Sequence, residues 1–394
     1  MSKYALLPLL LIALLNTPTS SLASTGDASS GEPVKVGLVT ALSGQSASAG
    51  EAITRGLMIA INEINANGGI LGGRKIELIS RDDQSSPSIG QSEARELIDR
   101  YHVAVIFGGI DSPVSLAMVP IVNQKKTILM GTWGADTAIT RNNANPNYVF
   151  RVSGVDDLVD RFLVSYAIKK DHAKKGGMML IDNAWGESNK SGLDAAMAKA
   201  GMGNAGAEKF QDRDVDMVPQ LSRLKKNGAD AIFLVSNAIA GAQTVKAMRQ
   251  MGWNAPIISH WGISGGRFPE LAGPSASKVV FVQTYSFMGV QSTIGKKVIQ
   301  EYESAYGVKS PAEITSPVGV ADAYDAMHLT ALAISKAGST DGDAIREAFY
   351  KIGPYQGLIK NYTHPFTQEN HDALTENDYV MCHYVGNDVI PLAK

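Results

Sequence analysis

Short apolar runs alternate with longer amphipathic segments along almost the whole of this 394-residue chain. Val34 to Thr40 is compact and rich in β-branched residues. The following stretch, 51–67, carries apolar side chains at spacings of three and four, as one face of a helix requires. Repeated alternation of this kind is typical of βαβ units, in which helices cover both faces of a buried parallel sheet. The predicted fold class is therefore α/β, with a doubly wound parallel sheet.

The pattern restarts near Val152, which indicates a second doubly wound sheet of similar size. After a strand predicted at 279–282 come three more helical patterns, and these can pack back on the first lobe. We therefore expect two lobes with several chain crossings between them, which favours a hinge over a single tether. A cleft between such lobes is a natural ligand site, because both sheets present the carboxyl ends of their strands to it.

The first two dozen residues have the pattern of a secretory signal. Lys3 precedes an apolar run at 5–15, and small residues follow up to Ala23. Eleven helical residues rise roughly 16 Å, far less than the ~30 Å of a hydrocarbon core. Cleavage after Ala23 would give an exported, soluble chain in the periplasm, and no cysteine follows the signal to carry a lipid anchor.

Charge and cysteine content exclude other classes of partner. Lys and Arg number 36 against 38 Asp and Glu, so nothing indicates binding to nucleic acid or to an anionic membrane surface. Cys382 is the single cysteine, so no intrachain disulfide can form. The seven histidines show no metal-binding spacing, and no cofactor motif stands out. We expect a monomer without metal or cofactor.

The loops that follow the predicted strands carry the candidate binding residues. Three of the four tryptophans fall there, which favours an aromatic pocket over three separate core residues. Ser112 opens a helix, where its hydroxyl and the free backbone N–H groups suit a carboxylate, although a plain helix cap is the simpler alternative. The candidates in these loops are Asp111, Ser112, Trp133, Gly134, Ala135, Trp185, Asn237, His260 and Trp261.

One segment fits a hydrolase pattern. Residues 262–266 match G-x-S-x-G around Ser264, and His383 lies downstream. Pro269 interrupts the helix that a nucleophile elbow needs, so an exported serine esterase is the less favoured alternative.

Four segments resemble the periplasmic branched-chain amino-acid binding proteins, the type I substrate-binding proteins of ABC importers. They are 34–44, the long block 60–70, Asp82-Asp83 and 323–326. The resemblance covers nearly the whole mature chain and implies two Rossmann-like lobes, joined by three hinge strands, that close on a small molecule and deliver it to a membrane permease. It implies no catalysis.

The resemblance also implies the lobe boundaries and the crossings between the lobes. The crossings are expected near 151–154, 282–285 and 355–358. The expected division is 1–23 for the signal peptide, 33–151 with 283–354 for lobe 1, and 152–282 with 355–394 for lobe 2.

Residue by residue, the resemblance gives Ser112 the role of holding a ligand carboxylate. Gly134 and Ala135 match the next contact pair, with only backbone groups left for the second polar contact, and Trp185 matches an aromatic residue that packs on the ligand. The main departure is Trp261, because amino-acid binders carry an acidic residue there that pairs with the ligand's ammonium group.

That departure changes the expected ligand. A buried ammonium without a carboxylate partner costs several kcal/mol, so the sequence favours a hydrophobic, aromatic carboxylate over a free amino acid. Ala49 replaces a bulky aromatic at the pocket mouth, His260 is a candidate donor to a ring substituent, and Tyr285 is a weaker lining candidate. A branched-chain amino acid, an amide or a urea stays the alternative ligand, and a sensor role stays open beside transport.

Overall fold

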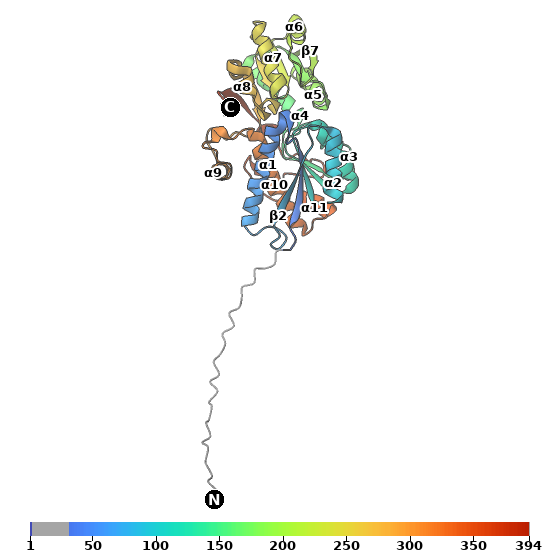
Figure 1. The fold of residues 1–394 in the computed structure, drawn as a ribbon. Helices are drawn as coiled ribbons and strands as arrows, with labels where there is room; N and C mark the ends of the chain where they lie inside the picture. Colours follow the sequence, from blue (N-terminus) through green and yellow to red (C-terminus); the bar gives the residue numbers. More distant parts are fainter. Residues whose placement is uncertain (2–30, 394) are drawn as a thin grey trace.

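The computed structural model describes residue 1 and residues 31–393, so the predicted signal peptide lies outside the described residues apart from Met1. Two separate parallel-type sheets form two lobes, stacked end to end in Figure 1. Lobe 1 is built on a five-stranded sheet of order β2-β1-β3-β4-β5, all parallel. Its strands are β1 Val34–Thr40, β2 Ile76–Asp82, β3 Val105–Gly108, β4 Ile128–Gly131 and β5 Val149–Arg151.

Lobe 2 is built on a seven-stranded sheet of order β14-β13-β10-β9-β8-β6-β7. The strands β10, β9, β8, β6 and β7 are parallel, and the C-terminal hairpin β13–β14 adds two antiparallel strands at one edge. These strands are β6 Lys175–Ile181, β7 Gly203–Phe210, β8 Ala231–Val235, β9 Ile257–Ser259, β10 Val279–Gln283, β13 Val380–Val385 and β14 Asp388–Pro391.

Helices cover both faces of each sheet, as the alternating pattern predicts. In Figure 1, α1, α2, α3, α10 and α11 surround the first sheet, while α5 to α8 surround the second. The helices are α1 Ala47–Ala66, α2 Pro87–Asp99, α3 Ser112–Lys125, α4 Asp156–Asp171, α5 Ala184–Ala200, α6 Val218–Lys226, α7 Ala238–Gln250, α8 Phe268–Ala272, α9 Thr293–Tyr306, α10 Pro317–Ala337 and α11 Gly342–Phe349. Short 3₁₀ helices lie at η1 Gly44–Ser46, η2 Trp261–Gly265, η3 Gly273–Lys278, η4 Pro311–Glu313 and η5 Glu376–Asp378, and β11 Tyr355–Gln356 pairs with β12 Asn361–Tyr362.

The C-terminal part of the chain does return to lobe 1, as predicted. Helix α10 packs directly on α1, and the approach is so close that a Cβ added at Gly56 would lie 2.3 Å from the carbonyl oxygen of Val320. Only glycine permits backbones to approach this closely. The return of 284–337 to lobe 1 gives the chain its second crossing, after β10.

The third crossing differs from the prediction. Residues 355–373, expected in lobe 2, pack on lobe 1: the Tyr362 hydroxyl donates to Asp325 of α10, and Phe366 meets Phe150 of β5 edge-on. The chain reaches lobe 2 at η5, where Glu376 pairs with Arg161 of α4, and β13 then pairs with β10. This segment has no helical or strand periodicity, so the sequence pattern alone could not locate the crossing.

One hinge strand is fixed by a buried ion pair. Arg151, the last residue of β5, is 0% exposed, and its guanidinium donates to Asp372 at 2.9 Å and to Thr140 at 2.8 Å. The same guanidinium donates to the carbonyl oxygens of Gly134 and Asp136. Arg151 therefore joins the first crossing, the segment before the third crossing and the loop after β4.

Among the described residues, no helix combines the length and the hydropathy needed to span a membrane.

Candidate ligand site between the lobes

Most of the predicted site residues line one small cavity between the lobes. The cavity has a volume of about 20 Å³ and is walled by residues that follow β3 and β4 of lobe 1 and β6, β8 and β9 of lobe 2. The carboxyl ends of parallel strands thus converge on one point from both sheets, as predicted. The lining residues are Ile110, Asp111, Ser112, Pro113, Trp133, Ala135, Asn183, Trp185, Asn237 and Trp261.

Ser112 holds together the lobe 1 half of this cavity. It is the first residue of α3, and its hydroxyl oxygen accepts the backbone N–H of Ala135 and that of Asp136, each at 3.1 Å. Both N–H groups are thereby satisfied, which leaves the Ser112 hydroxyl proton as the donor available to a ligand. The predicted contact between a ligand and the N–H of Ala135 would require that bond to break. Gly134 does not line the cavity.

Each of the three indole rings packs on a glycine. A Cβ added at Gly154 would lie 2.0 Å from Trp261, one at Gly262 would lie 2.6 Å from Trp185, and one at Gly319 would lie 3.0 Å from Trp133. None of these glycines has a positive φ, so space and not backbone conformation requires them. The glycines therefore set how deeply the rings sit.

We expect Gly154→Ala to lower the free energy of unfolding by about 1–3 kcal/mol, because the new methyl group overpacks the Trp261 ring. Urea unfolding measures the loss. Adding Trp261→Phe to Gly154→Ala should recover part of it, since the smaller ring leaves room. Gly353→Ala is the matched control, because a Cβ there meets nothing within 4 Å. An unchanged stability in Gly154→Ala would show that the ring does not pack there.

Asp156 orients two aromatic side chains, those of Trp185 and His260, and was not among the residues predicted from the sequence. Its Oδ1 accepts the indole N–H of Trp185 at 3.2 Å and faces Nε2 of His260 at 3.1 Å. Because Nδ1 of His260 accepts the backbone N–H of Trp261, the proton of a neutral ring lies on Nε2 and is donated to Asp156. The only sequence signal was an acidic residue at the start of a helix after the first crossing, which ordinary helix capping also explains.

Three further residues predicted to bind the ligand, His260, Tyr285 and Ala49, do not line the cavity. His260 is 0% exposed and spends both ring nitrogens on the contacts just described, so it is not free to bond a ring substituent. Tyr285 donates its hydroxyl to Gln291 and does not line the cavity. Ala49 is buried behind the wall, where a Cβ at Gly265 would meet it at 3.4 Å.

Hydrogen bonds from lobe 1 to lobe 2 close the cleft. The Ser48 hydroxyl of α1 donates to the carbonyl of Gly265 at 2.8 Å, and the Ser316 hydroxyl donates to the carbonyl of Ser264 at 2.9 Å. Ser188 of α5 accepts the backbone N–H of Thr137 at 3.2 Å. These bonds hold the two lobes together around the cleft.

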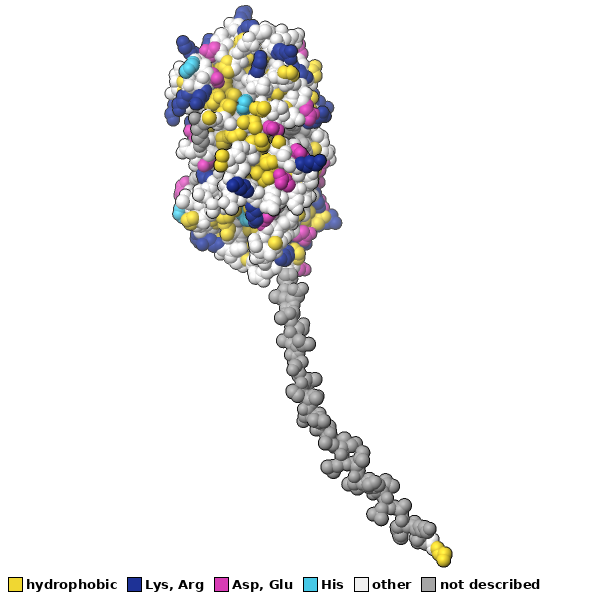
Figure 2. Space-filling view, turned by 90° about the vertical axis from the view of Figure 1, so that its left-hand side faces the viewer, with side chains coloured by type: hydrophobic (Ala, Val, Ile, Leu, Met, Phe, Trp, Pro, Cys, Tyr) yellow, Lys and Arg dark blue, Asp and Glu magenta, His cyan; other side chains and the backbone are white. Residues whose placement is uncertain are grey.

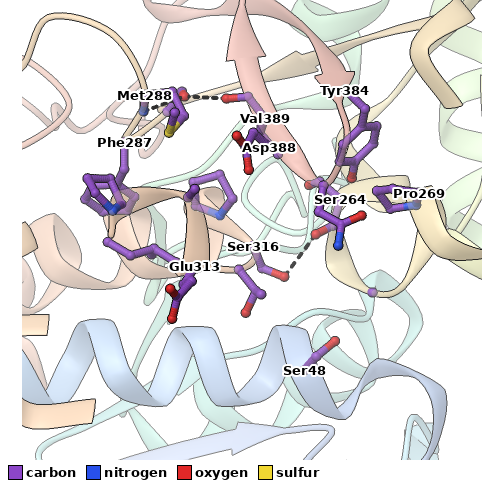
Figure 3. Close-up of a pocket in the computed structure, with 18 of the residues that line it drawn as sticks. Ser48, Ser264, Pro269, Phe287, Met288, Glu313, Ser316, Tyr384, Asp388 and Val389 are labelled. Atoms are coloured by element: carbon purple, nitrogen blue, oxygen red, sulfur yellow. Dashed lines mark hydrogen bonds between the residues drawn. The ribbon is translucent and has the colours of Figure 1, made fainter. Parts of the chain in front are cut away.

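A larger groove of about 470 Å³ lies outside those bonds, near the C-terminal hairpin. Figure 3 shows Ser316, Ser264 and Ser48 at its floor, with Phe287, Met288, Tyr384 and Val389 around it. In Figure 2, hydrophobic side chains gather across the middle of the face that carries α9 and the C-terminal strands. The groove contains none of the predicted ligand-binding residues.

The geometry around Ser264 does not support the esterase alternative. Ser264 is buried, and its hydroxyl donates to the carbonyl of Trp261 at 2.7 Å and accepts from Gln283 at 3.0 Å. A nucleophilic serine needs a general base within hydrogen-bond reach, and neither partner is one. His383 pairs with Val280 in the lobe 2 sheet. Within residues 31–393, no cluster of three or more His, Cys, Asp or Glu has an arrangement for a metal ion.

The fold and the cavity define a type I periplasmic binding protein: two α/β lobes, three crossings and a small cavity between the lobes. Residues 33–385 match the model of the periplasmic binding protein family. The chain belongs to this family, and its similarity to branched-chain amino-acid binding proteins confirms the resemblance seen in the sequence.

Three relatives illustrate the range of the family. A Leu/Ile/Val-binding protein homologue of Brucella melitensis is 23% identical over 338 residues, covering 85% of this chain and 88% of the relative. The leucine-binding protein LivK of Thermotoga maritima superposes with a TM-score of 0.81 at 23% identity, over 91% of this chain and 98% of that one. A solute-binding protein of an R. palustris ABC transporter, solved with 4-hydroxybenzoate, gives a TM-score of 0.78 at 20% identity, over 92% and 96%.

Proposed function

We propose that this chain is exported to the periplasm and serves there as the substrate-binding protein of an ABC importer. The observation that carries the proposal is the convergence of Ser112 and Trp133 from lobe 1 with Trp185 and Trp261 from lobe 2 on one cavity. A ligand that touches both lobes stabilises the closed form by its differential affinity, and a membrane permease can then recognise that form.

The lining supports a ligand with a compact apolar body. Trp133, Trp185 and Trp261 each offer an aromatic surface, and a well-placed aromatic contact adds about 0.5–1.5 kcal/mol beyond area burial. The present volume of about 20 Å³ holds roughly one water molecule, whereas a cavity that binds benzene measures about 150 Å³. A ring-bearing ligand would therefore hold the lobes farther apart than they lie here.

Two candidates remain for the polar end of the ligand. An aromatic carboxylate is the hypothesis from the sequence. It is supported by the free hydroxyl proton of Ser112 and by the 4-hydroxybenzoate found with the R. palustris relative. A branched-chain amino acid or an amide is supported by the names of the Brucella and Thermotoga relatives. Trp261 offers no negative charge to an ammonium group, so an amino acid would need an acid from elsewhere in the cleft.

Calorimetry on residues 24–394 tests the proposal with 4-hydroxybenzoate, L-leucine, benzamide and urea. We expect one-to-one binding of at least one ring-bearing probe, a change in tryptophan fluorescence, and about 2.7 kcal/mol of added stability at 100 times the dissociation constant. Ser264→Ala should bind equally well. Tight binding of L-leucine alone would contradict the aromatic body, and hydrolysis of a nitrophenyl ester that is lost in Ser264→Ala would restore the esterase.

A further inference from the structure

One side chain in the wall of the interlobe cavity is ionisable, that of Asp111; the other described lining residues are neutral. Asp111 precedes α3, yet its carboxyl group makes no cap hydrogen bond to that helix. The residue as a whole is partly exposed, but its Oδ2 is buried and has no hydrogen-bond partner among the described residues. Burial raises the pKa of Asp111 to about 6, and the nearby Ser85 hydroxyl offsets part of that rise.

The groups that face Asp111 are themselves acidic. Across the cleft, the charge of Asp212 from lobe 2 adds to the raised pKa of Asp111. Asn237, another lining residue, lies 3.4 Å from an oxygen of Asp212. Behind Asp111 in lobe 1, burial raises the pKa of Asp83 to about 7, and the charge of Asp111 contributes to that rise. Arg213 offsets part of the charge on Asp212.

A carboxylate ligand would meet this negative field without a basic residue in the described wall. A buried charge without a partner costs several kcal/mol, and a second charge of the same sign beside it adds to that cost. A positive ligand would remove the cost, because it supplies the missing partner of Asp111. Indole rings also attract organic cations through their π faces, and three of them line the same cavity.

We propose that the ligand carries a cationic nitrogen, an ammonium or amidinium group on a compact apolar body, which pairs with Asp111 and packs against Trp133, Trp185 and Trp261. The inference rests on the proposed function, since it names the substrate class of the same site. Residue 261 is a tryptophan and carries no negative charge. Asp111 of lobe 1 supplies that charge instead. An aromatic carboxylate is then excluded by charge and not by shape.

Three probes of nearly the same shape test this: benzamidine is positive, benzamide neutral and benzoate negative. Calorimetry at pH 7.5 and low salt on residues 24–394 should rank benzamidine first and benzoate last, with roughly a tenfold or larger step from benzamidine to benzamide. Asp111→Asn keeps the shape and removes the charge. This variant should lose that step, so that benzamidine binds no more than about threefold tighter than benzamide.

Asp182→Asn is the matched control. Like Asp111, Asp182 follows a parallel strand, here β6 of lobe 2, but it pairs with Lys209 at the surface and does not line the cavity. Removing its charge should leave the benzamidine preference intact, since exposed charges are screened.

A second measurement covers the case in which Asp111→Asn does not fold. The wild type should bind benzamidine up to about tenfold more weakly for each pH unit below 6, because Asp111 becomes protonated in the free protein. Protonation of Asp83 and Asp212 lowers the affinity for benzamidine as well.

If benzoate binds as tightly as benzamidine or more tightly at pH 7.5, the inference is overturned and the proposed function still stands. If none of the three probes binds, the inference and the aromatic ligand body both fail.

Discussion

Replacing Arg151 by methionine should lower the free energy of unfolding by about 3–5 kcal/mol, measured by urea unfolding. Methionine keeps much of the side-chain volume but leaves the Asp372 carboxylate buried with one charged partner fewer. The Thr140 hydroxyl and the carbonyls of Gly134 and Asp136 lose a donor at the same time. Removing one partner of a buried pair costs far more than the pair itself contributes, because the remaining charge stays out of water.

Arg141 provides the matched control for this prediction. It also approaches Asp372, at 3.5 Å, but its side chain is 45% exposed. Arg141→Met should therefore cost no more than about 1 kcal/mol. The double variant Arg151→Met with Asp372→Asn should cost less than the sum of the single variants, since both sides of one interaction are then gone. Equal losses in Arg151→Met and Arg141→Met would contradict the buried ion pair.

Arg151→Met should also affect the candidate ligand site. Arg151 holds the carbonyls of Gly134 and Asp136, and these residues flank Ala135, whose N–H bonds to Ser112. Loss of the guanidinium frees the loop after β4, so the cavity wall loses its fixed position. The side chain of Arg151 thus connects the hinge strand β5 to the wall of the cavity through hydrogen bonds.

Most of the fold could be predicted because the central strands of each sheet are buried on both faces. The compact run 34–40 matches β1 residue for residue, and the strand predicted at 279–282 matches β10 to within one residue, since continuous apolar runs between turn residues leave little choice. The prediction failed where no periodicity exists. Residues 355–373 attach to lobe 1 through single contacts such as Tyr362 with Asp325, and no spacing along the chain encodes such contacts.

The sequence predicts which residues lie at the candidate site better than it predicts the hydrogen bonds that these residues make. The rule that ligands gather at strand ends selects Ser112, Trp133, Trp185 and Trp261, because it depends on topology alone. Which atoms these side chains engage depends on the packing of both lobes. The bond between Ser112 and Ala135 therefore appears only in three dimensions. Asn183 caps α5 by accepting the N–H of Gly186, which places Trp185 in the first turn of this helix and not in the loop expected from the sequence.

Replacing Ser112 by alanine should have the second large effect, on stability and on binding together. The substitution leaves the buried N–H groups of Ala135 and Asp136 without their acceptor, at a cost of about 2–4 kcal/mol in the free energy of unfolding. It also removes the hydroxyl proton available to a ligand. Binding of benzamide should weaken by roughly tenfold, as expected for one lost hydrogen bond.

Ser115→Ala separates these effects from a general disturbance of α3. Ser115 is as deeply buried as Ser112 and lies about one turn farther along the same helix, but it does not line the cavity. Its replacement should leave benzamide affinity unchanged within about twofold, which is within 0.4 kcal/mol. Calorimetry and urea unfolding on both variants give the comparison. Removing a hydroxyl that joins α3 to the loop after β4, or that binds the ligand, must leave unpaired polar groups behind. If Ser112→Ala and Ser115→Ala behave alike in both measurements, Ser112 therefore has neither role.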